Sequence, residues 1–479
     1  MITFLACLAI LIGGYFIYGT YVEKVVGVND NNITPATRLQ DGVDYVPMPW
    51  YKVFLIQFLN IAGVGPIFGA VMGAMFGPVA FLWITFGTIF AGGVHDFLSG
   101  VISMKHDGTS VSEIVGLYLG KTMKIIMRIF SVVLLILVGT VFVTSPAGLL
   151  ASMTGKSLMF WTAIIIVYYV IATILPVDKV IGKIYPVFGA ALMIMAIGIC
   201  GAMFIGEFNG TMHMPELTLQ NLHPNGLSVF PFLFTTIACG ALSGFHATQS
   251  PMMARCVNKE SESKRVFYGA MVAEGVIALV WAAVAMAFFG GTEGLATGLS
   301  ELGGQSGVVT HISKSLLGSV GAVLAILGVV ACPITSGDTA FRSARLTIAD
   351  AFKIKQEGLK NRFILALPLF AICIFLTQID FNIIWRYFAW SNQTLATIFL
   401  WTGSVFLVKN KKNHWITTLP ATFMSYICIS YILQAPEGFK LPATFSDIVG
   451  IIGAITLFVL FIFKVIKENK SQESISELA

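Results

Sequence analysis

The chain has 479 residues, of which 56% are hydrophobic and only 11% are charged. Soluble domains carry about 25% charged residues, so this composition excludes a soluble globular protein and indicates an all-α polytopic membrane protein. The net charge is +5, but the basic residues are scattered over short segments. We therefore expect a lipid bilayer, and no nucleic acid, as the partner of its surface.

Thirteen apolar runs are long enough to cross a bilayer as helices, for which about 20 residues suffice. In chain order they cover residues 2–21, 53–77, 79–103, 125–152, 158–175, 185–206, 229–254, 266–290, 315–336, 362–378, 382–408, 414–434 and 446–466. We therefore predict about thirteen transmembrane helices.

The basic residues predict the orientation of these spans. Of the 29 Lys and Arg residues, all but Lys156, Lys314, Arg386 and Lys440 fall in loops after odd-numbered spans or in the C-terminal tail. Cytoplasmic loops hold the excess of basic residues. This alternation predicts a multi-pass protein of a prokaryotic cytoplasmic membrane, with its N-terminus outside and its C-terminus in the cytoplasm.

The second and seventh runs contain residues that weaken a helix. "NIAGVGPIFG", from Asn60 to Gly69, has three glycines and a proline, and "CGALSGFHATQSPMM", from Cys239 to Met253, has two glycines and a proline. Such residues also serve close packing between membrane helices, which is the alternative reading. Interruptions at matching positions of two halves are the best sequence pointer to a transporter binding site.

The two interrupted runs lie five spans apart, an odd number, so the second copy of a five-span unit would enter the membrane from the opposite face. We predict a five-plus-five inverted repeat with discontinuous helices 2 and 7, like the LeuT-like core of the amino acid-polyamine-cation superfamily. The repeats would cover residues 53–206 and 229–408. Residues 1–52 would add a span and a cytoplasmic loop, and residues 409–479 two spans and a tail.

Broken backbone is tolerated at membrane depth only where it faces protein or a water-filled cavity, and its freed N–H and C=O groups can then bind a solute. We expect "GVGP" and "SGFHATQSP" to face each other across a central cavity. His246 would bind a substrate carboxylate or carry a proton, or else is a satisfied core histidine. The substrate-binding candidates are Asn60, Gly63, Gly65, Ser243, His246, Gln249, Arg386 and Asn392.

Ionisable side chains inside spans are costly and therefore mark functional sites. The topology places Asp96, Glu274 and Asp338 toward the cytoplasmic side, with His95 beside them. We expect these three acids to converge. They would couple transport to protons, with Glu274 as the first candidate, or brace the inward face through salt bridges to Arg342 and Arg345.

Hydroxyl groups near the end of the ninth span suggest a second coupling ion. Thr335, Ser336 and Thr339 would lie near the first interrupted helix, where they would hold sodium or simply satisfy helix carbonyls. The seven cysteines show no C-x-x-C spacing, which argues against a zinc site and against a disulfide framework. We expect no cofactor and no bound metal, a proton as the coupling ion, and sodium as the alternative.

Five motifs carry a family resemblance. "DGVDYVP", "NIAGVGPIFGA", "FAGGVHDF", "TIACGALSGFHATQSPMMARC" and "ACPITSGDTAFRSARL", in this order, resemble the carbon starvation protein A family. The resemblance implies a secondary transporter that imports peptides or, in some members, pyruvate, with protons. It also implies pathway roles for Asn60, Gly63, Gly65, Asp96, Ser243, His246, Gln249 and Asp338.

The chain departs from the family pattern in two places. Longer members are similar to "HHF" before the first glycine motif, whereas this chain has Ile56, Gln57 and Phe58, which removes a histidine pair as a proton relay. It also lacks the additional C-terminal region of the large members.

These observations predict a secondary transporter that imports short peptides with protons by alternating access, and pyruvate or another small carboxylate is the alternative solute. A channel would need selectivity rings and an enzyme a reactive constellation such as H-E-x-x-H, and neither signature is visible. A membrane sensor would carry a soluble signalling domain. The sequence predicts no particular oligomeric state.

Overall fold

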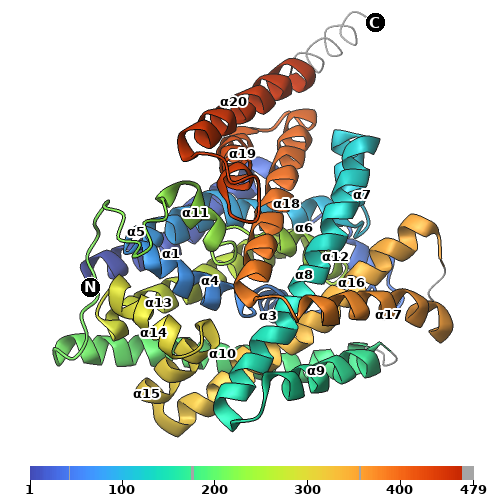
Figure 1. Ribbon diagram of the computed structural model, residues 1–479. Helices are drawn as coiled ribbons and strands as arrows, with labels where there is room; N and C mark the ends of the chain where they lie inside the picture. The colour runs from blue at the N-terminus through green and yellow to red at the C-terminus, as the bar shows by residue number, and fades with distance from the viewer. Residues whose placement is uncertain (43, 174–176, 355–357, 467–479) are drawn as a thin grey trace, which may run out of the picture.

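The computed structural model describes residues 1–42, 44–173, 177–354 and 358–466. Within these ranges the chain is helical apart from its loops and one isolated parallel bridge between Met48 and Val257. The predicted all-helical fold is confirmed. Figure 1 shows helices distant in sequence, such as α8 (Lys121–Thr154) and α18 (Phe381–Lys409), lying side by side through the molecule.

The other helical segments of the apolar runs, some of them short, follow in chain order. They are α1 (Ile2–Val26), α3 (Trp50–Ile61), α4 (Gly65–Gly73), η1 (Ala74–Phe76), α5 (Val79–Leu82), η2 (Trp83–Gly92), α6 (Gly93–Lys105), α9 (Leu158–Ala172), α10 (Val177–Phe208), α11 (Val229–Thr236), α12 (Gly244–Ala254), η4 (Lys264–Tyr268), α13 (Gly269–Phe289), α15 (Gln305–Ala325), η5 (Ile326–Ala331), α16 (Cys332–Phe352), α17 (Leu359–Leu376), α19 (Trp415–Gln434), α20 (Ala443–Phe461) and η6 (Ile462–Ile466). Shorter helices are α2 (Pro35–Arg38), α7 (Val111–Leu119), η3 (Glu260–Glu262) and α14 (Thr292–Glu301).

Nine described helices are long and apolar enough to cross a membrane, and the bent pair formed by α3 and α4 with η1 makes ten. The other expected spans are helical, but they are too short, too interrupted or too polar to count as crossings by length and hydropathy. α9 is only 15 residues long, α11 and α12 are separated by a break, and the polar residues of α18 lower its hydropathy. The total of thirteen crossings therefore remains a prediction from the sequence.

The ninth span differs from its predicted limits, 315–336. The backbone of Gly318 adopts φ 59° and ψ −142°, a left-handed conformation that breaks α15 near the expected start. Beyond it, helix continues through η5 and α16 as far as Phe352. Asp338 therefore lies within a helix and not at its end.

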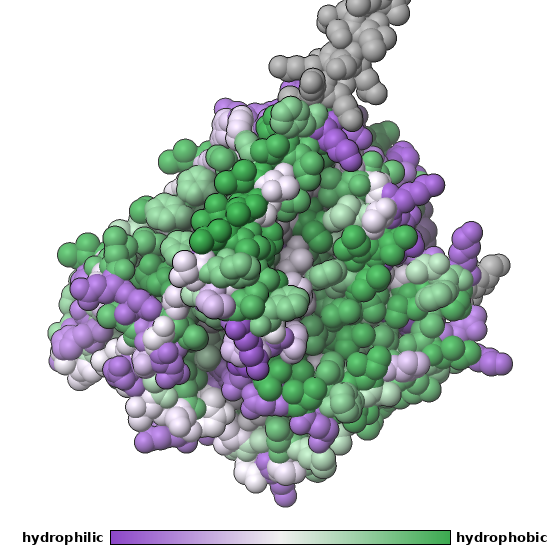
Figure 2. Space-filling model, turned by 45° about the horizontal axis from the view of Figure 1, so that its top comes forward, coloured by the Kyte–Doolittle hydropathy of each residue, from purple (hydrophilic) through white to green (hydrophobic). Residues whose placement is uncertain are grey.

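The surface helices are suited to lipid. Of the most apolar 18-residue windows, those of α1, α17 and the α20–η6 segment are only 17–22% buried, whereas those of η2–α6 and η4–α13 are 83% and 78% buried. Exposed isoleucine, leucine and phenylalanine side chains cover the outer helices, and Figure 2 shows broad hydrophobic areas on the face that it presents. The η2–α6 and α13 helices thus form the interior.

Three loops assigned to the cytoplasmic side lie against one another. The Met48 backbone N–H donates to the Cys256 carbonyl at 3.1 Å, and the Arg255 guanidinium donates to the Gly108 carbonyl at 3.0 Å. These contacts place the loops after the first, third and seventh spans on one face, as the alternation of basic residues requires. The orientation of that face, and the repeat boundaries, remain predictions.

The close packing of α12 on α18 provides a test of the fold. A Cβ at Gly244 would lie 2.4 Å from the Asn392 carbonyl oxygen and 2.5 Å from the Ala396 nitrogen, both backbone atoms. Gly244→Ala should lower stability by about 1–3 kcal/mol because the helices must separate. Thermal unfolding of the detergent-solubilised protein measures this change.

Gly201→Ala in α10 is the matched control, because no atom lies within 4 Å of the new methyl group. This variant should gain about 0.5–1 kcal/mol from reduced backbone freedom. Equal unfolding temperatures for the two variants would contradict the described packing.

Candidate functional site

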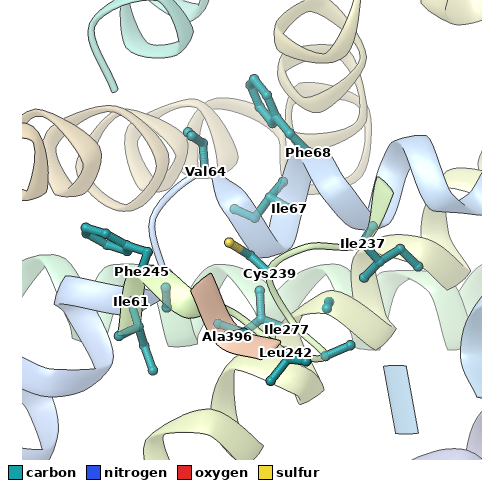
Figure 3. Packing of buried hydrophobic residues seen from close by; sticks show 14 of the residues in the cluster. Ile61, Val64, Ile67, Phe68, Ile237, Cys239, Leu242, Phe245, Ile277 and Ala396 are labelled. Atoms are coloured by element: carbon teal, nitrogen blue, oxygen red, sulfur yellow. The ribbon is translucent and has the colours of Figure 1, made fainter. Parts of the chain in front are cut away.

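The first break separates α3 from α4, whose axes differ by 50°. A Cβ at Gly65 would lie 2.7 Å from the Cys239 sulfur and 2.8 Å from its Cβ, so only glycine permits this contact. Cys239 belongs to the second break, residues 237–243, between α11 and α12. Figure 3 shows its sulfur turned toward α4 near Ile67. Both predicted breaks are present, but Gly65 and Cys239 are in direct contact and do not face each other across the predicted cavity.

Amide side chains of α18 satisfy the backbone of the second break. Asn392 Nδ2 donates to the Ala238 carbonyl at 3.1 Å, and its Oδ1 accepts from the Phe245 N–H at 2.7 Å. Gln393 Nε2 donates to the Phe234 carbonyl at 3.0 Å. Unpaired backbone groups at membrane depth cost several kcal/mol each, so these two amides stabilise the interrupted helix.

The π-helical segment η2 supports the same break from its other side. Thr88 Oγ1 lies 2.9 Å from the Gly240 carbonyl, and Trp83 Nε1 donates to the Ile237 carbonyl at 3.3 Å. π-helical turns occur frequently at functional sites because they re-aim side chains. No residue pattern predicts this π-helix, which lies inside an otherwise regular apolar run.

Four ionisable side chains meet beside the second break. Asp96 Oδ2 lies 2.7 Å from His246 Nδ1, and Asp96 Oδ1 lies 2.8 Å from His95 Nδ1. On the other side of the ring, His246 Nε2 lies 3.3 Å from Glu274 Oε2. All four side chains are completely buried. The structure thus joins α6, α12 and α13 through one chain of acid and imidazole groups.

This cluster has unused bonding capacity. Among the described residues, both Glu274 oxygens and the Nε2 atoms of His95 and His246 have no hydrogen-bond partner. A buried charge is costly unless it is paired, so a proton or cation bound here would be held strongly. Chemically, the arrangement can pass a proton between Asp96 and Glu274 through the two nitrogens of His246.

Asp338 does not join the other two acids. Its Oδ2 lies 3.5 Å from Arg342 Nη2, and both residues line a cavity of about 10 Å³ with Thr173 and Arg345. This ion pair matches the alternative of a salt bridge to Arg342, and the convergence of the three acids on the cytoplasmic side stays a prediction. Helix α16 directs the Asp338 side chain toward α9 and α17, away from the cluster around His246.

Of the three hydroxyl residues of α16, one reaches the first broken helix. Ser336 Oγ donates to the Leu59 carbonyl at 3.2 Å, near the end of α3. The hydroxyls of Thr335 and Thr339 donate to carbonyls of their own helix. These bonds match the alternative in which the hydroxyls satisfy helix carbonyls, and a sodium site here remains a prediction.

Arg386 lies apart from the other candidates. Its Nε donates to Glu437 Oε2 at 2.9 Å, in the segment that follows α19. The guanidinium is partly exposed and the Glu437 carboxylate is 2% exposed. The structure gives Arg386 the role of an ion-pair partner and does not bring it to the substrate-binding candidates.

The remaining candidates are buried beside the breaks. Asn60 Oδ1 and Gln249 Oε1 have no hydrogen-bond partner in the described chain, and Gly63 packs on the Phe142 ring. Sequence reasoning missed Gln57, whose amide is fully buried and likewise without a described partner. Gln57 lies three residues before Asn60, on the same face of α3, and this spacing could have identified it as a candidate from the sequence.

Comparison with known proteins agrees with the fold. The profile described as "Carbon starvation protein CstA" matches residues 1–159, 146–290 and 282–431. An uncharacterized membrane protein of Haemophilus influenzae is 43% identical over 350 residues, covering 63% of this chain and 94% of that protein. The peptide transporter CstA of Bacillus subtilis is 28% identical over 532 aligned positions, covering 89% of each chain.

Solved structures show a shared fold at low identity. MhsT, in complex with L-phenylalanine, has a TM-score of 0.55 at 15% identity and covers 85% of this chain and 97% of its own. A manganese transporter of Eremococcus coleocola has a TM-score of 0.54 and covers 90% of this chain. The predicted LeuT-like core is confirmed. The chain is a multi-pass secondary transporter, not an enzyme, and belongs to the carbon starvation protein CstA family.

Proposed function

We propose that this protein imports short peptides across a prokaryotic cytoplasmic membrane by alternating access, driven by proton entry. The observation that carries the proposal is the buried Asp96–His246–Glu274 chain directly beside two touching helix breaks. The name of the Bacillus subtilis relative, a peptide transporter at 28% identity, supports the choice of solute.

The chemistry of the broken helices favours peptides. The amides of Gln57, Asn60 and Gln249 are buried on α3 and α12, the two half-helices on the predicted cytoplasmic side of the breaks, and each amide has a polar atom without a described hydrogen bond. An amide side chain both donates and accepts hydrogen bonds, as a peptide group does. These residues would therefore bind peptide backbone without regard to side chains.

Pyruvate and other small carboxylates are the alternative solute. A carboxylate is bound best by a fixed, well-placed cation such as a guanidinium. Among the substrate-binding candidates only Arg386 carries one, and Glu437 already neutralises it. His246 is the remaining group for a carboxylate, and Asp96 and Glu274 flank it with negative charge. These contacts favour the peptide over the carboxylate.

The packed interior represents a closed step of the transport cycle. Gly65 contacts Cys239, so a peptide enters only when α4 moves away from residues 237–243. A proton on Glu274 would remove the charge that burial makes costly, and so would favour the packed state, in which Glu274 is fully buried, over the separated one. This linkage would couple proton entry to peptide entry.

Uptake by proteoliposomes distinguishes the two solutes. With an imposed inward proton gradient, we expect labelled tripeptide to accumulate above equilibrium and labelled pyruvate not to. An inward sodium gradient of equal size should not drive tripeptide uptake. Accumulation of pyruvate without tripeptide would refute the peptide assignment, and sodium-driven accumulation would refute proton coupling.

Glu274→Gln tests the coupling residue. The neutral side chain has nearly the same shape but cannot release a proton, so gradient-driven accumulation should fall at least tenfold. Tripeptide binding and exchange at equal concentrations should persist. Glu293→Gln, on exposed α14, is the matched control and should accumulate peptide like the unmodified protein. Normal accumulation by Glu274→Gln would remove Glu274 from the coupling mechanism.

A further inference from the structure

The second break also brings together three side chains that bind transition metals. One ligand atom of each of Cys239, His246 and Glu274 lies within 4.8 Å of the other two, and all three residues are buried. Within this group, His246 Nε2 and Glu274 Oε2 are 3.3 Å apart. Ligands about 2.0–2.3 Å from a tetrahedral zinc ion lie about 3.3–3.8 Å from one another, so small side-chain shifts would complete the site.

The imidazole of His246 is oriented as in a metal site. Asp96 Oδ2 lies 2.7 Å from His246 Nδ1, and this contact orients the ring so that His246 Nε2 points toward Glu274. Metal-binding histidines commonly pair their second nitrogen with a carboxylate in this way. Within the described part of the chain, His246 Nε2 and both Glu274 oxygens form no hydrogen bond, and Nε2 and Oε2 face each other as an ion pair at 3.3 Å. These buried atoms are therefore available as ligands.

Two polar neighbours contact the sulfur of Cys239, and the thiolate is the form of this side chain that would bind metal. Asn392 Nδ2 and Ser243 Oγ each lie 3.6 Å from the sulfur, and both groups can donate hydrogen bonds to it. One thiolate and one carboxylate would balance the two charges of a zinc ion. Binding would thus neutralise a carboxylate that is otherwise buried beside another acid.

We propose that Cys239, His246 and Glu274 bind one Zn²⁺ ion, leaving a fourth position for water or a backbone carbonyl of the break. Thiolate and imidazole ligands select zinc-like metals over Mg²⁺ and Ca²⁺, which require oxygen ligands. The ligands come from residues 237–243, α12 and α13, so the spacing of the cysteines does not reveal the site.

The bound ion would restrict movement of the second break. It would tie residues 237–243 to α13 and occupy the atoms that the proposed proton path uses, so Zn²⁺ should inhibit peptide uptake. This consequence rests on the proposed function, whereas the binding itself does not.

Metal content tests the binding directly. The purified full chain is stripped with chelator in detergent, equilibrated with Zn²⁺, desalted and analysed by mass spectrometry. We expect about one zinc per chain in the unmodified protein and in Cys428→Ser, a buried cysteine of α19 outside the site. Cys239→Ser and Glu274→Gln should each bind zinc at least tenfold more weakly.

Cobalt provides a spectroscopic check of the ligands. Co²⁺ in place of Zn²⁺ should give a near-ultraviolet thiolate-to-cobalt absorption in the unmodified protein and in Cys428→Ser, but not in Cys239→Ser. No stoichiometric zinc, or zinc and cobalt signals unchanged in both Cys239→Ser and Glu274→Gln, would overturn the proposal. Glu274→Gln keeps the test decisive if Cys239→Ser fails to fold.

Uptake measurements then separate this proposal from the proposed function. Micromolar Zn²⁺ should inhibit tripeptide uptake by the unmodified protein, and chelator should restore it. Stoichiometric zinc in a protein that transports no peptide would uphold the metal site and refute the peptide function. Peptide transport by a protein that binds no zinc would uphold the peptide function and refute the metal site.

Discussion

The structure depends on a single constraint: a backbone that leaves its helix at membrane depth must find new hydrogen-bond partners within the protein. The second break meets this constraint through Asn392 and Gln393 on one side and through Trp83 and Thr88 on the other. These residues belong to helices that are distant in sequence. The interrupted helix is therefore a property of the assembled core, and it cannot persist once α18 or η2 is displaced.

The same constraint explains why the ionisable residues gather where they do. A helix break at the centre of the protein offers the polar surroundings in which His246 contacts both Asp96 and Glu274. On its own helix, Asp96 contacts only the adjacent His95, and Glu274 lies among the mainly apolar side chains of α13. The chemistry of this transporter is thus concentrated at one break, and the first break contributes glycine and amide groups.

Much of this arrangement could be predicted from the sequence, because it follows from local composition. Glycine and proline inside apolar runs located both breaks, and the rarity of acids in spans singled out Asp96 and Glu274. The partners could not be predicted, because they depend on which face of each helix is buried. Helix α16 turns Asp338 toward Arg342, and Glu437, beyond the core, neutralises Arg386.

The role of the two breaks is tested most directly by an experimental structure of the protein with a bound tripeptide. We expect peptide density between α4 and residues 237–243, with Gly65 and Cys239 separated and the amides of α3 and α12 in contact with the peptide backbone. Unbroken helices at these positions, or a peptide bound away from both breaks, would contradict this role.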